Sequence, residues 1–320
     1  MRHAARSAAI AAAIVVGLLL VRATDEGPAP AHAQPCRALA AGDHALTVAT
    51  DAGERAVLLH VPAGGATTPR PLVVALGGAG QTGAQFARDT AYSTLADREH
   101  FLVAYPTAAG AKPFWNMNGH VPGRPDDVAF LRAALDRVED ATCVDPSRVY
   151  ATGVSNGGGM TALLGCELAD RLTAIAPVAG GYGTQPACHP SRPLAVLEVH
   201  GTADQVVPYA GKGAGHSGSV SSFLAMWRRL DRCTGGVRRV PGVPPSVTEL
   251  AWWPCSPGAD VVHDRVAGER HGWPSWWRTV PSRTTYSTTW RTWAFFRGHA
   301  RAPSPSTDTA ARDGAAPPPG

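Results

Sequence analysis

Lysine and metal-binding motifs are scarce in this sequence of 320 residues. Only Lys112 and Lys212 are lysines, so the formal net charge of +4 rests almost entirely on arginine. We interpret this as a bias in composition and expect no nucleic-acid partner. The six cysteines form no C-x-x-C pair, and no H-E-x-x-H occurs. These absences argue against a zinc site, and we expect neither a metal nor another cofactor.

The uncharged apolar run near the N-terminus is too short for a typical membrane span. It covers residues 7–21, whereas a transmembrane helix needs about 20 apolar residues. Basic residues precede it, and the small-x-small pattern Ala31-His32-Ala33 follows it. We therefore predict a signal peptide over residues 1–33, a secreted protein and no stable membrane anchor after cleavage. A retained anchor is the alternative, and Pro35 directly before Cys36 disfavours a lipoprotein.

The cysteines all follow the predicted cleavage site, which fits an oxidising compartment and up to three disulfides. Six cysteines permit 15 pairings, and the sequence does not distinguish them. Our choice among them is Cys36 with Cys143, Cys166 with Cys188, and Cys233 with Cys255.

Short apolar runs bounded by glycine and proline alternate with helical stretches along residues 34–300. We predict strands at 56–62, 71–76, 101–105, 148–153, 174–178, 194–200 and 260–266, and helices at 84–99, 126–140, 156–168, 220–231 and 287–297. Such alternation predicts an α/β domain with a mostly parallel central sheet and helices on both faces. Residues 301–320 are rich in proline and alanine without a period, which predicts a disordered tail.

The strongest functional signal is the pattern G-x-S-x-G at residues 153–157, with Ser155 at its centre. It falls between a predicted strand and a predicted helix, where a sharp turn lifts the serine hydroxyl above the sheet and requires small neighbours. The alternative is a chance turn in a chain with 35 glycines. The position between strand and helix favours a nucleophile.

A serine nucleophile needs a histidine to take its proton and a carboxylate to orient that histidine. In the α/β-hydrolase fold the chain order is serine, acid, histidine. Asp204 and His271 follow Ser155 in that order, each just after a predicted strand, at the carboxyl edge where open α/β sheets bind ligands. A histidine base must be neutral, so we expect activity to fall as the pH drops through roughly 6.5.

Three other histidines compete for the role of base. His200 ends a predicted strand and is interpreted as a packed structural histidine. His263 lies within a strand beside Asp264, and neighbours on a strand point to opposite faces, so these two cannot cooperate. His216 lies in a glycine-rich loop upstream of the last strand. The chain order favours His271.

The oxyanion formed during acyl transfer needs two backbone N–H donors. One follows the nucleophile, which indicates Asn156, and the other comes from the loop after the early strand. In that loop we favour Ala79, with Gly78 as the alternative. Tryptophan faces can stack on a phenolic ring, a sugar or a polyester chain. We predict Trp273, Trp276 and Trp115 as substrate-binding residues.

With these residues assigned, several segments resemble a family of secreted α/β-hydrolase esterases that includes polyhydroxybutyrate depolymerase-like lipoproteins and feruloyl esterases of carbohydrate esterase family 1. The resemblance extends over roughly residues 52–298 and rests on 71–76, 126–131, 144–158, 175–180 and 200–209. It implies that Ser155, Asp204 and His271 are nucleophile, acid and base. The family usually has histidine where this chain has Gly77, which affects the rigidity of the oxyanion loop.

We therefore predict a secreted serine carboxylic-ester hydrolase that acts through an acyl-enzyme. Expected substrates are feruloyl or acetyl esters of plant polysaccharides, or short polyesters of hydroxyalkanoates. Two alternatives remain, namely a cell-envelope acyltransferase on the same fold and a non-catalytic carbohydrate-binding relative. Transfer of an acyl group to a sugar would distinguish the first, and binding to xylan without reaction towards a fluorophosphonate would distinguish the second.

Overall fold

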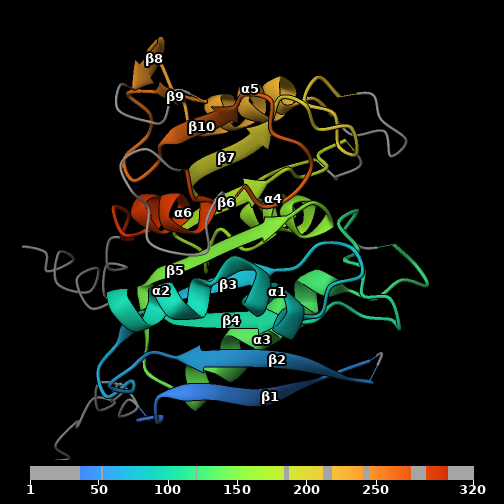
Figure 1. The fold of residues 1–320 in the computed structure, drawn as a ribbon, viewed down its shortest axis with the longest axis vertical. Coiled ribbons are helices and arrows are strands. Elements are labelled where there is room, and N and C mark those ends of the chain that lie inside the picture. The colour runs from blue at the N-terminus through green and yellow to red at the C-terminus, as the bar shows by residue number, and fades with distance from the viewer. Residues whose placement is uncertain are drawn as a thin grey trace, which may run out of the picture. The chain divides into compact units, whose positions relative to one another are not determined.

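A ten-stranded sheet, in the order β1-β2-β4-β3-β5-β6-β7-β10-β9-β8, runs through the described part of the protein (Figure 1). The computed structural model describes residues 37–51, 53–119, 121–183, 187–211, 218–240, 246–274 and 286–301. The predicted signal peptide and the predicted tail beyond residue 301 lie outside these ranges. Within the ranges, no helix is long and apolar enough to cross a membrane.

The six central strands of the sheet are parallel to one another. In sheet order they are β4 (Leu102–Pro106), β3 (Arg70–Leu76), β5 (Val144–Val154), β6 (Ala174–Val178), β7 (Ala195–Gly201) and β10 (Val261–Val266). Their apolar residues are buried almost throughout, as expected for parallel strands covered on both faces. The predicted fold class is confirmed.

Helices cover both faces of the sheet. One apolar core forms under α3 (Asp127–Ala141), α4 (Asn156–Glu167) and α5 (Val220–Leu230). A second core forms under α1 (Gly83–Thr90), α2 (Tyr92–Glu99) and α6 (Thr288–Phe296), which lie in front of the sheet in Figure 1. Alternate residues of each strand enter alternate cores, because successive side chains of a strand point to opposite faces.

The structure differs from the sequence prediction at the helix over 84–99 and at both edges of the sheet. A single helix there is wrong, because Ala91 takes a left-handed conformation, φ 53°, which ends α1 and precedes α2. Of the antiparallel strands at the edges, β2 (Gly53–Val61) matches the strand predicted at 56–62. The others, β1 (Gly42–Thr50), β9 (Val247–Trp252) and β8 (Val237–Val240), were not predicted.

Two of the predicted disulfides are present. Cys166 at the end of α4 bonds to Cys188, and Cys233 after α5 bonds to Cys255 after β9. The third predicted pair includes Cys36, which lies outside the described residues. Both confirmed bonds join a helix end to a loop, so they hold the ends of α4 and α5 near their neighbours.

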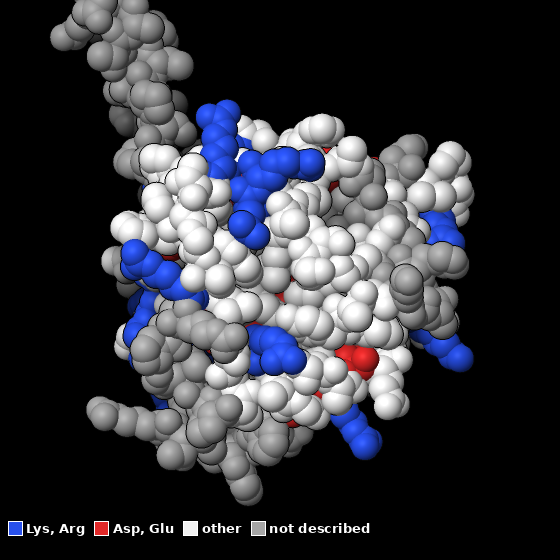
Figure 2. Space-filling model, turned by 90° about the horizontal axis from the view of Figure 1, so that it is seen from above, with Lys and Arg blue, Asp and Glu red and all other residues white. Residues whose placement is uncertain are grey.

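Basic side chains form no single continuous patch on the face of the protein shown in Figure 2. Figure 2 shows one face, on which lysine and arginine side chains stand in several separate groups and few acidic side chains are visible. Several arginines are paired elsewhere, for example Arg171 with Asp136 and Glu139.

Candidate active site

Ser155 lies at a sharp turn between β5 and α4. Its backbone is in an unusual region, φ 59° and ψ −119°, which strands and helices do not use. A Cβ at Gly157 would lie 2.3 Å from the backbone oxygen of Leu76, and one at Gly153 would lie 2.5 Å from the oxygen of Gly157. The turn can therefore form only because the G-x-S-x-G pattern has glycine at both positions.

His271 lies within hydrogen-bonding distance of both Ser155 and Asp204. The Oγ of Ser155 is 2.9 Å from Nε2 of His271, and Nδ1 of His271 is 2.7 Å from Oδ2 of Asp204. When Nδ1–H donates to the carboxylate, Nε2 is free to accept the serine proton. This arrangement can convert the hydroxyl into a nucleophile.

The sheet brings these three residues together from distant parts of the chain. Asp204 follows β7 and His271 follows β10, and these strands are parallel neighbours whose carboxyl ends lie at one edge. Backbone bonds tie the turn after β7 to the chain after β10, since the amide of Ala203 donates to the oxygen of Glu269. The positions of Asp204 and His271 therefore depend on each other.

Asp204 is held as a carboxylate. Its Oδ1 accepts the amides of Val206 and Val207 at 2.9 and 2.8 Å. Burial alone would raise the pKa of Asp204, but hydrogen bonds from His200, His271 and the Val207 amide lower this pKa well below its ordinary value. A charged acceptor thus faces Nδ1 of His271.

Two of the competing histidines are buried within the sheet. His200 and His263 are buried at 1% and 0% exposure on the strands β7 and β10, and both contact Glu198. Asp264 binds Arg291 and Tyr286 on the opposite face of the sheet from His263. His216 lies outside the described residues.

The side chains of Trp115 and Gln81 hold the loop after β3, a role that the sequence did not predict for either. The indole N–H of Trp115 donates to the oxygen of Gly77 at 3.0 Å, and the amide of Gly78 donates to Oε1 of Gln81 at 2.8 Å. Trp115 also pairs with the side chain of Asn156, donating its amide to Oδ1 and accepting from Nδ2. These bonds restrain the loop around Gly77 and Gly78.

The predicted substrate-binding tryptophans have different surroundings. Trp273 lines a cavity of about 470 Å³ together with Ser155 and His271. Its ring packs edge to face on Phe86, and its N–H donates to Thr289 at 3.0 Å, so its orientation is fixed. The other lining residues are Gly78, Ala79, Gln81, Phe86, Asp89, Val154 and Gly272.

Trp115 is 1% exposed and stacks on Phe130 instead of lining that cavity. Its hydrogen bonds go to Gly77 in the loop after β3 and to Asn156. Trp276, the third predicted residue, lies outside the described residues. Backbone-directed contacts such as those of Trp115 leave no pattern in the sequence.

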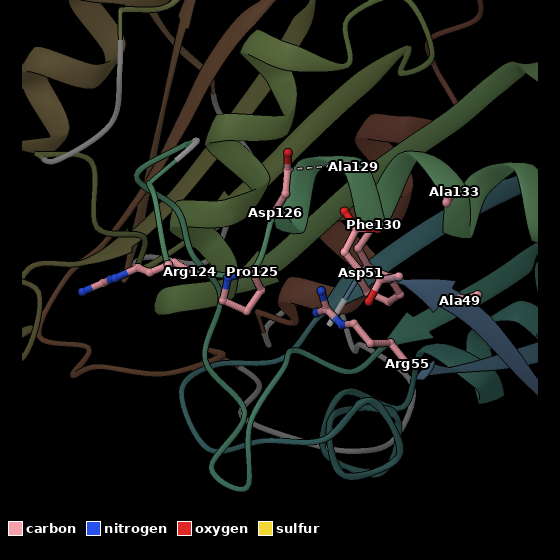
Figure 3. Close-up of a pocket in the computed structure, with 11 residues that line it drawn as sticks. Ala49, Asp51, Arg55, Arg124, Pro125, Asp126, Ala129, Phe130 and Ala133 are labelled. Carbon is pink, nitrogen blue, oxygen red and sulfur yellow. Dashed lines mark hydrogen bonds between the residues drawn. The ribbon is translucent and has the colours of Figure 1, made fainter. Parts of the chain in front are cut away.

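A buried ion pair supports the segment that carries Trp115. Arg55 on β2 contacts Asp127 at 2.5 Å, and the other oxygen of Asp127 accepts the amide of Asn116 at 2.6 Å. The guanidinium lies 3.5 Å from the ring centre of Phe130, and the two side chains lie together at a second cavity, of about 660 Å³ (Figure 3). A chain of contacts thus joins this cavity to the turn at Ser155.

Comparisons with known proteins find esterases among the proteins similar to this chain. The family model described as esterase PHB depolymerase matches residues 55–188. A bifunctional acetylxylan esterase/xylanase of Neocallimastix patriciarum is 29% identical over 67% of this chain and 30% of its own length. Feruloyl esterase B of Piromyces equi is 37% identical over 38% of this chain and 24% of its own length. A poly(3-hydroxyalkanoate) depolymerase of Paucimonas lemoignei is 33% identical over 41% and 33%.

This chain spans only about a quarter to a third of the length of these relatives. Solved structures extend the likeness of the fold. An acetyl xylan esterase from Aspergillus awamori superposes with a TM-score of 0.54 at 15% identity, covering 72% of this chain and 94% of the other. The poly(3-hydroxybutyrate) depolymerase LpqC from Bordetella parapertussis gives 0.50 at 16% identity, covering 72% and 85%. The resemblance to the esterase family of depolymerases and feruloyl esterases is confirmed.

The tight turn at Ser155 predicts that Gly157→Ala will disrupt the protein. The added methyl would meet backbone oxygens of Leu76 and Gly77 at 2.3 and 2.4 Å. We expect a loss of about 2–3 kcal/mol in the free energy of unfolding, measured by urea denaturation. Gly236→Ala is the matched control, because a Cβ there meets nothing within 4 Å. Equal stability of the two variants would contradict the steric argument.

Proposed function

We propose that this protein is a serine carboxylic-ester hydrolase. The observation that carries the proposal is the contact series from Ser155 through His271 to Asp204, with distances of 2.9 and 2.7 Å, at the wall of a cavity. The names of the relatives, which include acetylxylan esterase, feruloyl esterase and depolymerase, support it. Ser155 is the nucleophile, His271 the general base and Asp204 the residue that orients His271.

The reaction proceeds through an acyl-enzyme. Oγ of Ser155 bonds to the ester carbonyl carbon while its proton passes to Nε2 of His271. The tetrahedral intermediate collapses as the bond to the leaving oxygen breaks, and His271 returns the proton to the released alcohol. Water then attacks the acyl-enzyme with the same assistance, and the free acid leaves. Asp204 keeps its charge throughout and stabilises the imidazolium form of His271.

The oxyanion is stabilised by the amides of Asn156 and Ala79. Asn156 is the first residue of α4, and the first helical amides have no acceptor within their helix. Ala79 lines the cavity beside Ser155. Gly78, the alternative, already donates its amide to Gln81, so Ala79 is favoured.

The substrate is an ester with a small or aromatic acyl group. The cavity beside Ser155 is about 470 Å³, and the fixed ring of Trp273 offers an apolar face within it. Feruloyl or acetyl esters of plant polysaccharides fit these walls, as do short hydroxyalkanoate esters. Secretion is part of the proposal, and the two disulfides support an oxidising compartment.

Substitution of the proposed catalytic residues is the direct test. We expect Ser155→Ala to abolish hydrolysis of p-nitrophenyl acetate and Asp204→Asn to lower kcat about 10⁴-fold, because the wrong tautomer of His271 then faces the serine. Ser93→Ala is the control, since Ser93 bonds to Tyr105 away from the cavity. Retained activity in purified Ser155→Ala would show that another residue is the nucleophile.

The proposed oxyanion donor can be removed without changing a side chain of the triad. Ala79→Pro deletes the amide proton, whereas Ala79→Gly keeps it. We expect Ala79→Pro to lower kcat about 100-fold with little change in KM, and Ala79→Gly to lower it far less. If both variants keep the wild-type kcat for p-nitrophenyl acetate, Ala79 is not a donor.

The substrate class can be tested with one enzyme preparation on methyl ferulate, acetylated xylan and a hydroxybutyrate polymer film. We expect faster release of acid from methyl ferulate and acetylated xylan than from the film, because the cavity is small and has one fixed aromatic wall. The ranking is measured as kcat/KM for the soluble ester and as acid released per enzyme for the polymers. A new sugar ester in the presence of a sugar acceptor would instead indicate acyl transfer.

A further inference from the structure

A cluster of buried polar residues lies directly behind Asp204. Glu198 and His200 alternate on β7, and His263 on β10 stands opposite Glu198 in the parallel register. All three are at most 1% exposed. They share the face of the sheet that α5 covers (Figure 1). On that face Phe223 of α5 stacks on Tyr182. Burying polar groups is costly unless they are paired, so the partners of the two ring nitrogens indicate whether His200 is charged.

Both ring nitrogens of His200 face acceptors. Nδ1 lies 2.9 Å from Oε1 of Glu198. Nε2 lies 2.9 Å from the backbone oxygen of Val207 and 3.3 Å from Oδ2 of Asp204. A neutral imidazole has one N–H and would turn a lone pair towards one of these oxygens. His200 is therefore an imidazolium between two buried carboxylates.

The remaining members of the cluster, Glu198 and His263, contact each other and two tyrosines. Glu198 accepts from the hydroxyl of Tyr182 at 2.9 Å and lies 2.7 Å from Nδ1 of His263. Nε2 of His263 is 2.7 Å from the hydroxyl of Tyr209, which can donate to it. His263 thus contacts Glu198 and Tyr209. In contrast to His200, it makes no hydrogen bond or ion pair with Asp204 among the described residues.

The pKa shifts of His200 and Glu198 agree with a charged His200. Burial alone would lower the pKa of His200, but its bonds to Asp204 and Glu198 raise this pKa to about 10. Burial likewise favours neutral Glu198, but the histidines lower its pKa to about 2. The charged or titratable groups around His200 are Glu198 on its own strand, His263 and Arg265 on β10, Asp204 and Tyr209 after β7, and Tyr182 after β6.

His200 contacts the turn that carries Asp204 at two points. It binds Val207 through the backbone oxygen, and Val207 in turn donates its amide to Oδ1 of Asp204. The same ring nitrogen approaches Oδ2 of Asp204, the oxygen that also receives Nδ1–H of His271. Two histidines therefore share one carboxylate oxygen, one buried and charged, the other facing Ser155.

We propose that His200 is a positioning residue for the reaction: as a permanent imidazolium it fixes the Asp204 carboxylate and reduces the negative charge that this carboxylate presents to His271. The inference rests on the proposed function, because it concerns the acid of that triad. Its effect is to keep His271 neutral, and so able to act as base, at lower pH than an unshared carboxylate would allow.

The variant His200→Gln tests the proposal by removing the charge while keeping an amide donor. We expect the acidic limb of the kcat/KM profile for p-nitrophenyl acetate to move about one pH unit towards neutral. At the plateau we expect kcat to fall roughly tenfold with unchanged KM, because Asp204 is less well placed. His263→Asn is the matched control from the same buried cluster, and we expect its acidic limb to stay in place.

A second measurement does not depend on activity or on the stability of a variant. In wild-type protein labelled with ¹⁵N-histidine, NMR should show one ring with two protonated nitrogens that persist at pH 8, which lies above the ordinary histidine pKa of roughly 6.5 and below the pKa of about 10 for His200. A neutral His200 ring at pH 7 would overturn the proposal, whether or not the enzyme is active.

The outcomes separate this inference from the proposed function. A wild-type protein that hydrolyses no ester would overturn the proposed function and, with it, a role for His200 in catalysis. An active wild type whose His200→Gln variant folds, keeps the same acidic limb and loses no kcat would overturn only the role of His200. An equal shift of the acidic limb in His263→Asn would also overturn it, since a general disturbance of the cluster would then explain both.

Discussion

The parallel pairing of β7 with β10 is the constraint on which the site depends. It sets the carboxyl ends of two strands side by side, so the turn after β7 and the chain after β10 can exchange backbone bonds and bring Asp204 to His271. The same register places His263 beside Glu198 within the sheet. One strand pair therefore determines both the contact between Asp204 and His271 and the position of the buried cluster behind Asp204.

A second set of contacts holds the other side of Ser155. The ion pair of Arg55 and Asp127 fixes the segment at Asn116, the neighbouring Trp115 binds Asn156, and its indole reaches Gly77. Breaking a buried ion pair by removing one partner leaves an uncompensated charge. The backbone on both sides of the oxyanion position is thus restrained by residues that do not touch the cavity at Ser155.

Much of the central fold could be read from the sequence, because buried parallel strands and their helices leave strong apolar patterns. The order of Ser155, Asp204 and His271 was available for the same reason, since each follows such a strand. The break at Ala91 was not, because neither glycine nor asparagine marks it. The antiparallel strands β1 and β9 were missed because they are only partly buried.

The long-range hydrogen bonds were also beyond the sequence. Trp115 was interpreted as a substrate contact, yet its bonds go to backbone atoms and to Asn156, 41 positions away. His200 was interpreted as structural from its place at a strand end, and its approach to Asp204 depends on how the turn folds back over β7. Local patterns indicate which residues are buried but not which partners they meet.

The bonds between Pro274 and Thr288 have a consequence for how this protein can vary. Thr288 donates both its amide and its hydroxyl to the oxygen of Pro274, and Thr289 accepts the indole N–H of Trp273. These bonds hold Pro274 and Thr288 side by side, three residues after His271. Closing a longer segment between fixed ends costs little extra free energy. The number of residues between these two anchors could therefore change during evolution without moving Ser155, Asp204 or His271.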